Sequence, residues 1–282
     1  MRWWSPRVAI RSRGRPPGAA RPPAWGRRAF LAAALALAAA PAPFAPAPFA
    51  PAWAAAPTSC EAPPELLDNA APLPATERAL AEGALRVLVV GSASVLGPGS
   101  STPAHAWPAR LEASLHESRP ALRLEVKVRG GRGLTAADML PLIEGATSPP
   151  PHLVIWQVGT VEAARGLEPD WLAGRLATGL EGLKERGIDA VLMDQQFSRF
   201  LRANADINAY QDTIRIAAAG QGAAVFPRYE LMRHWADTDR IDLERAPRAG
   251  RAAMVDLLGD CLGGAIAAFV LRGASLAAGP RP

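Results

Sequence analysis

VLVVGSASVLGPGSSTPAHAWPARLEASL, residues 87–115, is the stretch of the chain that decides its fold. It begins with apolar, mostly β-branched residues and passes through a Gly91-Ser92-Ala93 turn and a glycine- and proline-rich loop into an apolar pattern with helical spacing. A strand that leads through a glycine turn into a helix is typical of a parallel β-α-β unit. We therefore expect a strand over Leu85–Val90 and a helix over Ala106–Glu117.

The same alternation continues along the chain. Continuous apolar runs such as LVIWQV, residues 153–158, are typical of parallel strands that are covered on both faces. Strands are expected at Leu85–Val90, Leu122–Val128, His152–Val158, Asp189–Met193 and Ala223–Phe226, and helices at Ala106–Glu117, Ala136–Ile143, Asp170–Arg186, Asn204–Ala219 and Ala252–Val270. The pattern predicts an α/β protein: a flavodoxin-like, three-layer α/β/α sandwich around a mainly parallel five-stranded sheet. A binding site is then expected beyond the carboxyl ends of the strands.

The first 56 residues have the features of an export signal. They contain eight arginines and no acidic residue, so the net charge of +5 for the whole chain leaves −3 for the remainder, and a nucleic-acid partner is not indicated. Gly26–Leu31 (GRRAFL) resembles the twin-arginine motif, and the apolar run 29–40 is too short to span a membrane. We expect cleavage near Ala54–Ala56 and a periplasmic or secreted protein with no membrane span; an uncleaved anchor and a start nearer Trp25 are the alternatives.

The chain contains two cysteines, Cys60 and Cys261. An even number in an exported protein permits one disulfide, which would close a loop of about 200 residues and stabilise the fold by about 4–5 kcal/mol. Two inert thiols are the alternative. The proline-punctuated segment 57–83 is expected to be an N-terminal arm, followed by a domain over 84–273 and a flexible tail over 274–282.

Four blocks of this sequence resemble the SGNH (GDSL-type) hydrolases. The Gly91-Ser92-Ala93 turn stands where that family has G-D-S, and one branch continues from G-S-S-S-T to Y-P-A-R-L, as WPARL does here. Arg129–Gly133 resembles the second block, VIWQVGT at Val154–Thr160 the third, and Met254–Leu262 the last. The resemblance covers about 200 residues and implies the SGNH fold and, in the family's active members, ester hydrolysis.

The family's chemical groups are replaced at four positions. Ala93 stands at the nucleophile, Gly250 and Ala253 at the aspartate and histidine of the triad, and Val161 at an asparagine that donates to the oxyanion; only Gly133 of the oxyanion donors is retained. Alanine has no oxygen with which to attack a carbonyl, and loss of one oxyanion donor typically lowers the rate by about 10²–10³. The sequence thus predicts a pseudo-esterase with a retained cleft. The residues expected to line that cleft are Gly91, Ser92, Ala93, Gly133, Thr160 and Val161.

Two other functions stay open. Ser92 or Ser94 could act as nucleophile in a carboxylic-ester or O-acetyl hydrolase if a displaced base, His105 or His234, came within hydrogen-bond reach. A purely structural protein is the third class. We expect no cofactor and no metal, since the acidic residues near 237–242 are typical of a solvated turn. The expected partner is an acyl- or sugar-containing small ligand or an envelope protein; the oligomeric state stays open.

Overall fold

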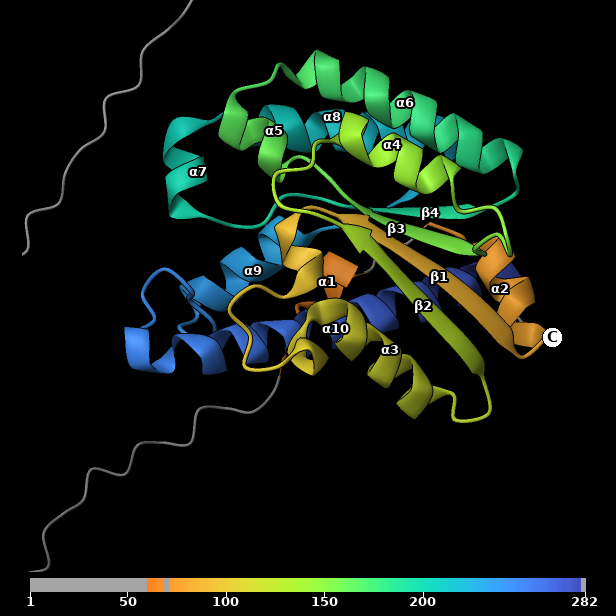
Figure 1. The fold of residues 1–282 in the computed structure, drawn as a ribbon, viewed down its shortest axis with the longest axis horizontal. Coiled ribbons are helices and arrows are strands. Elements are labelled where there is room, and N and C mark those ends of the chain that lie inside the picture. Colours follow the sequence, from red (N-terminus) through yellow and green to blue (C-terminus); the bar gives the residue numbers. More distant parts are fainter. Residues whose placement is uncertain (1–59, 68–70, 280–282) are drawn as a thin grey trace, which may run out of the picture. The chain divides into compact units, whose positions relative to one another are not determined.

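A computed structural model describes residues 60–67 and 71–279, all within one compact unit, and the predicted leader lies outside the described residues. Five strands form one sheet in the order β2-β1-β3-β4-β5, and every pair of neighbours is parallel (Figure 1). The strands are β1 (Ala84–Gly91), β2 (Arg123–Gly130), β3 (Leu153–Gln157), β4 (Asp189–Met193) and β5 (Ala224–Phe226). The predicted fold class and the predicted strands are confirmed, with ends that shift by one or two residues.

Helices cover both faces of the sheet (Figure 1). One layer holds α4 (Ala136–Glu144), α5 (Thr160–Arg165), α6 (Pro169–Glu185) and α8 (Ile207–Gln221). The other holds α2 (Pro74–Ala81), α3 (Trp107–Ser118), α9 (Arg228–Asp237) and α10 (Arg251–Ala278). Short elements complete the described chain: α1 (Pro64–Leu67), η1 (Ala93–Leu96), η2 (Pro103–His105), α7 (Arg199–Asn204) and η3 (Arg248–Gly250).

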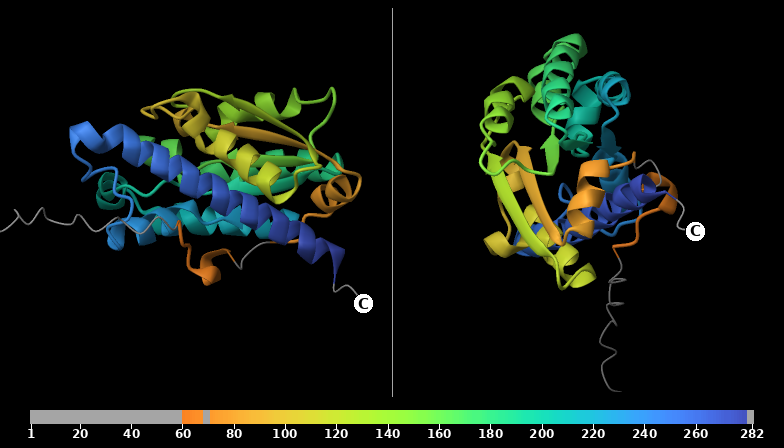
Figure 2. Two further views of the ribbon diagram at one scale, coloured as in Figure 1. Left: turned by 90° about the horizontal axis from the view of Figure 1, so that it is seen from below. Right: turned by 90° about the vertical axis from the view of Figure 1, so that its right-hand side faces the viewer.

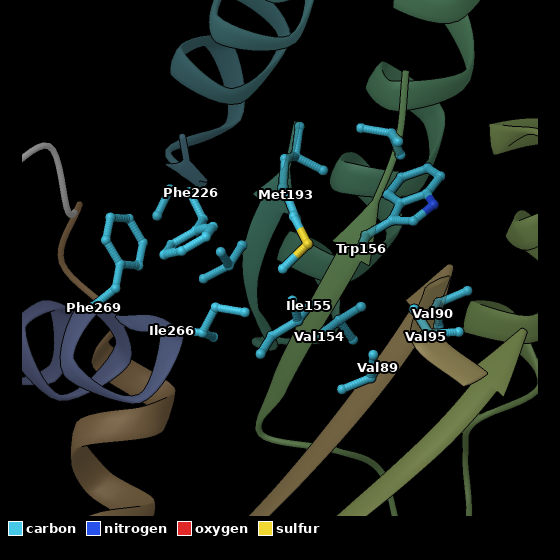
Figure 3. Close-up of a cluster of buried hydrophobic side chains, with 14 of the residues drawn as sticks. Val89, Val90, Val95, Val154, Ile155, Trp156, Met193, Phe226, Ile266 and Phe269 are labelled. Carbon is cyan, nitrogen blue, oxygen red and sulfur yellow. The ribbon is translucent and has the colours of Figure 1, made fainter. Parts of the chain in front are cut away.

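The core lies on the two faces of the sheet and is centred on β3, all of whose side chains are buried (Figure 3). Trp156 Nε1 donates to Met139 Sδ at 3.2 Å, so the indole is satisfied inside the helical layer that contains α4. On the other side, the rings of Phe226 and Phe269 meet edge to face with centroids 5.5 Å apart. Burial of each large apolar side chain stabilises the fold by about 1.5–3 kcal/mol. Because both faces of β3 are buried, its side chains form the continuous apolar run from which the strand was predicted.

The structure differs from the predictions in three places. The predicted helix 204–219 begins at Ile207 as α8, because Asp206 Oδ1 accepts from Ala209 N and caps it, while a separate short helix that was not predicted, α7, ends at Asn204. The expected tail from 274 is helical to Ala278, with Ala274 buried. The expected arm contains α2, which begins at a proline suited to the first helical turn and packs on α10 and β1.

Helix α10 is long and apolar enough to cross a membrane by length and composition alone. Half of its most apolar stretch is buried within the domain, where it packs along α3 beneath the sheet (Figure 2). Its composition is therefore the one expected of a central helix of this domain.

A disulfide joins Cys60 to Cys261, 201 residues apart. It ties the start of the described chain to α10. Trp235 Nε1 adds a second contact to the same segment by donating to the carbonyl of Glu61 at 3.1 Å.

Candidate functional site

The strand order places a crevice at the carboxyl ends of β1 and β3. The chain leaves β1 toward β2 on one side and leaves β3 toward β4 on the other, so the connections diverge between these two neighbours. Such a switch point is where doubly wound sheets bind ligands. The predicted cleft residues lie here, in η1 after β1, in the turn after β2 and at the start of α5.

Ser92 and Gly133, from two of these turns, contact each other directly. Gly133 N donates to Ser92 Oγ at 3.2 Å, and Ser92 is only 7% exposed. Gly133 has φ +76°, a left-handed conformation that glycine adopts without strain. Gly133 N, the donor that the sequence predicts for an oxyanion, is thus engaged by a hydroxyl of the same chain.

The residues that follow Ser92 carry no activated nucleophile. Ala93 begins η1 with a methyl side chain, and Ser94 Oγ donates to Gln157 Oε1 at 2.6 Å. Gln157 ends β3 and is buried, so the Ser94 proton is directed to a neutral amide. Among the described residues, neither Ser92 nor Ser94 forms a hydrogen bond to a histidine. Gln157 was not predicted as a site residue. The only signal in the sequence was a polar residue near the end of an apolar strand.

The turn after β3 is held by a residue that sequence reasoning also missed. Glu162 is 1% exposed; its Oε1 accepts from Ala136 N at 2.6 Å and its Oε2 from Gly159 N at 2.9 Å. Burial raises the pKa of Glu162, while these backbone donors oppose the rise. Thr160 Oγ1 accepts from Gln196 N at 3.0 Å. Val161 lies in the first turn of α5 and presents no donor.

Gly250 and Ala253, which the sequence predicts to stand at the family's aspartate and histidine, lie at the start of α10. Gly250 ends η3, and Ala253 is exposed in the first turn of the helix. The nearby Asp256 instead holds the loop after η1, since its Oδ1 accepts from Ser101 N at 2.8 Å. Neither Gly250 nor Ala253 has a side chain that could transfer a proton.

Of the two candidate bases, His105 is the one beside the crevice. His105 Nδ1 lies 3.3 Å from Asp260 Oδ1, and the same oxygen lies 2.7 Å from Arg110 Nε. His234 lies in α9, and no hydrogen bond joins its ring to a serine within residues 60–67 and 71–279.

A cavity of about 200 Å³ opens between the loop after η1, the start of α3, α9 and α10. It is lined by Ser94, Gly97, Pro98, His105, Ala106, Trp107, Gln196, Arg228, Leu243, Val255, Leu258, Gly259 and Leu262. We call it the α10 pocket. Its walls are mainly apolar, and it lies on the carboxyl side of the sheet; a hollow of about 210 Å³ beside α2 lies at the amino ends of the strands instead.

Buried polar groups continue past the crevice to the ends of β4 and β5. Asp194 Oδ1 accepts from Tyr229 N at 2.8 Å, and burial raises the pKa of Asp194 to about 7. Arg228 Nη2 donates to Gln196 Oε1 at 3.3 Å. Burial lowers the pKa of Arg228 to about 10, against the pull of the Asp194 carboxylate, so the guanidinium is charged at neutral pH. In the sequence, the polar run DQQ after β4, residues 194–196, was the only signal for this cluster of buried polar groups.

Comparisons with known proteins agree with this architecture. Residues 59–276 match the Non-GDSL lipase-like family. Among solved structures, a two-domain esterase (CEX) active on acetylated mannans is 13% identical, with a TM-score of 0.53 over 71% of this chain and 56% of that chain. A catalytic mutant of Axe2, an acetylxylan esterase from Geobacillus stearothermophilus, is 15% identical, with a TM-score of 0.51 over 67% and 94%.

TesA is 20% identical, with a TM-score of 0.48 over 63% of this chain and 97% of that one. No curated protein matches the sequence. The two esterase structures with TM-scores above 0.5 show a common α/β fold, and at these identities the chemistry has to be argued from the site.

Proposed function

The chain belongs to the Non-GDSL lipase-like family, an SGNH-type hydrolase group, and we propose that it is an exported pseudo-esterase that binds a ligand at the carboxyl edge of its sheet without hydrolysing it. The observation that carries this proposal is the hydrogen bond from Gly133 N to Ser92 Oγ beside Ala93. Ala93, at the position predicted for the nucleophile, has only a methyl side chain. Gly133 N, the predicted oxyanion donor, already donates to an acceptor of the chain. Hydrolysis by the family's mechanism needs both groups to be free for the substrate.

The arginine-bearing leader and the Cys60–Cys261 disulfide support export. Disulfides persist in the periplasm and outside the cell but are rare in the reducing cytosol. The α10 pocket supports binding, because it is a mainly apolar cavity with a few polar groups at the switch point of the sheet. Of the partners considered, an acyl-containing small ligand suits these walls better than a sugar, which needs more hydrogen-bonding groups.

An active esterase is the second candidate, because Ser94 and His105 line the same pocket and His105 approaches Asp260. In that mechanism Ser94 Oγ would attack the acyl carbon while His105 took its proton and passed it to the departing alcohol as the ester bond broke, and water would then hydrolyse the acyl-Ser94 intermediate. Against it, the Ser94 hydroxyl donates to Gln157 Oε1, and a neutral amide is a poor base.

Hydrolysis of p-nitrophenyl acetate by the purified mature chain separates the two functions. We expect no turnover above buffer and no labelling by a fluorophosphonate, in the wild type and equally in Ser94→Ala. Ser118→Ala, on the exposed end of α3, is the matched control. Turnover that disappears in Ser94→Ala or His105→Ala, but not in Ser118→Ala, would replace the pseudo-esterase with the second candidate. The double variant Ala93→Ser, Ala253→His reports whether the crevice still holds a reactive geometry.

A further inference from the structure

The α10 pocket combines a positive charge with an absence of acids among its lining residues. Arg228 and His105 both line it, whereas no aspartate or glutamate is among its described lining residues. His105 already lies beside Asp260. Arg228 is therefore the lining residue whose positive charge is available to a ligand.

Arg228 is a buried cation with unused donors. The residue is 1% exposed, and its Nε and Nη1 atoms have no hydrogen-bond partner among the described residues. It interacts electrostatically with Asp194, but no ion pair within 4.0 Å joins the two in that part of the chain, where Asp194 instead caps α9 through Tyr229 N. A buried charge without a paired anion is costly, and the cost falls when a ligand supplies one.

A second unpartnered donor borders the same cavity. Trp107 Nε1 is buried and has no acceptor within residues 60–67 and 71–279. Trp107 is also the first residue of α3, whose N-cap, Ala106, has no side-chain acceptor. The positive end of a 12-residue helix therefore lies at the pocket wall. Three independent features at one cavity favour negative charge.

We infer that the α10 pocket binds a short-chain carboxylate, with the carboxylate toward Arg228 and Trp107 and the alkyl chain against Leu243, Val255, Leu258 and Leu262. This inference rests on the proposed function, since a ligand that is held and not hydrolysed needs no free nucleophile. A planar guanidinium suits a carboxylate because two parallel N–H donors match its two oxygens. The apolar walls select a carboxylate over inorganic phosphate. The volume of about 200 Å³ is below the ~300–1,000 Å³ of pockets for drug-sized ligands, which limits the chain to a few carbons.

Isothermal titration calorimetry of the mature chain with acetate, butyrate, butyramide and inorganic phosphate tests the inference. Butyrate should bind, each added methylene should tighten binding about fourfold, and butyramide should bind at least about tenfold more weakly. Equal binding of butyramide, tighter binding of phosphate, or no heat from butyrate with folded protein would each overturn the inference.

Two variants locate the ligand. Arg228→Lys keeps the charge but loses the planar pair of donors and should weaken butyrate binding about tenfold, whereas Arg233→Lys, on an exposed part of the same helix, should leave it unchanged. Val255→Phe fills the cavity and should abolish butyrate binding while Arg228 stays intact, which keeps the test valid if Arg228→Lys does not fold. Unchanged butyrate affinity in Val255→Phe would place the ligand elsewhere.

The outcome is separable from that of the proposed function. A chain that neither hydrolyses p-nitrophenyl acetate nor binds butyrate would refute the carboxylate site and leave the pseudo-esterase standing. A chain that hydrolyses the ester through Ser94 would refute the pseudo-esterase, whatever the titration shows.

Discussion

Two buried glutamines mark the difference between the two halves of the carboxyl edge of the sheet. Gln157, at the end of β3, is 3% exposed and accepts from Ser94, whereas Gln195, just after β4, is 0% exposed and neither of its amide atoms has a partner among the described residues. The same contrast holds around them. On the β1–β3 side, Ser92 and Glu162 accept from backbone donors; on the β4–β5 side, Arg228 keeps unused donors.

This difference indicates which part of the edge has unpaired polar atoms that a ligand could bind. In the half where the sequence predicts the family's catalytic positions, Ser92, Ser94 and Glu162 each form hydrogen bonds within the chain, so few of their polar atoms are left for a ligand. In the neighbouring half, buried polar atoms lack partners, and such atoms destabilise the protein until something pairs with them. The proposed ligand site, the α10 pocket, therefore includes Arg228 at the start of α9 and several residues of α10.

The largest effect is expected from Glu162→Ala on the satisfied side. The change leaves Ala136 N and Gly159 N without acceptors in a buried place, so the free energy of unfolding should fall by about 2–6 kcal/mol. Urea denaturation followed by circular dichroism measures it. Glu144→Ala, at the exposed end of α4, is the control and should change stability by less than about 0.5 kcal/mol. A loss in Glu162→Ala as small as the control's would mean that this half does not depend on its internal acceptors.

A pH-dependent effect of intermediate size is expected from Asp194→Asn. Burial raises the pKa of Asp194 to about 7 in the folded protein, above about 3.9 in the unfolded chain. Below pH 4 the carboxyl is protonated in both states and has no effect on stability. Between pH 4 and 7 the unfolded chain ionises first, so folding is increasingly disfavoured, and above pH 7 the cost is constant.

The wild type should therefore lose on the order of 3 kcal/mol relative to Asp194→Asn as the pH rises from 4 to 7. Unfolding curves at one-unit pH steps measure the difference, with Asp170→Asn on the exposed surface of α6 as the charge-matched control. A wild type that instead gains stability over this range relative to Asp194→Asn would mean that Arg228 pairs with Asp194 strongly enough to keep it ionised.

The smallest effect is the most direct test of the contrast between the glutamines. Gln157→Met removes the acceptor of Ser94 and should cost about 1–2 kcal/mol, whereas Gln195→Met removes two unpaired polar atoms and should be neutral or stabilising by up to about 1 kcal/mol. Thermal unfolding of the two variants side by side gives the comparison. Similar losses in both would show that the Gln195 amide is satisfied in solution, and the two halves would no longer differ.

The amino-acid sequence by itself determined the parallel sheet and the family, and it predicted a site at the carboxyl ends of the strands in which catalytic groups are replaced. Strands such as 153–158 are recognisable because burial on both faces demands an unbroken apolar run, which is a local property. The prediction that Ala93, Val161 and Ala253 stand where the family has catalytic groups comes in the same way from short motifs, which are also local. Helix ends that depend on one cap, such as Asp206, were placed wrongly because the competing helical pattern ran straight through them.

Only the tertiary structure decided which polar groups meet. Ser92 and Gly133 lie 41 residues apart, Ser94 and Gln157 63, and each pair forms because adjacent parallel strands bring distant turns to one edge. Whether Arg228 would be paired or left with free donors depends on how the start of α9 meets the loop after β4. Sequence patterns record which side chains are apolar. They do not show which buried polar atoms form hydrogen bonds with each other, because the two partners are usually far apart in the sequence.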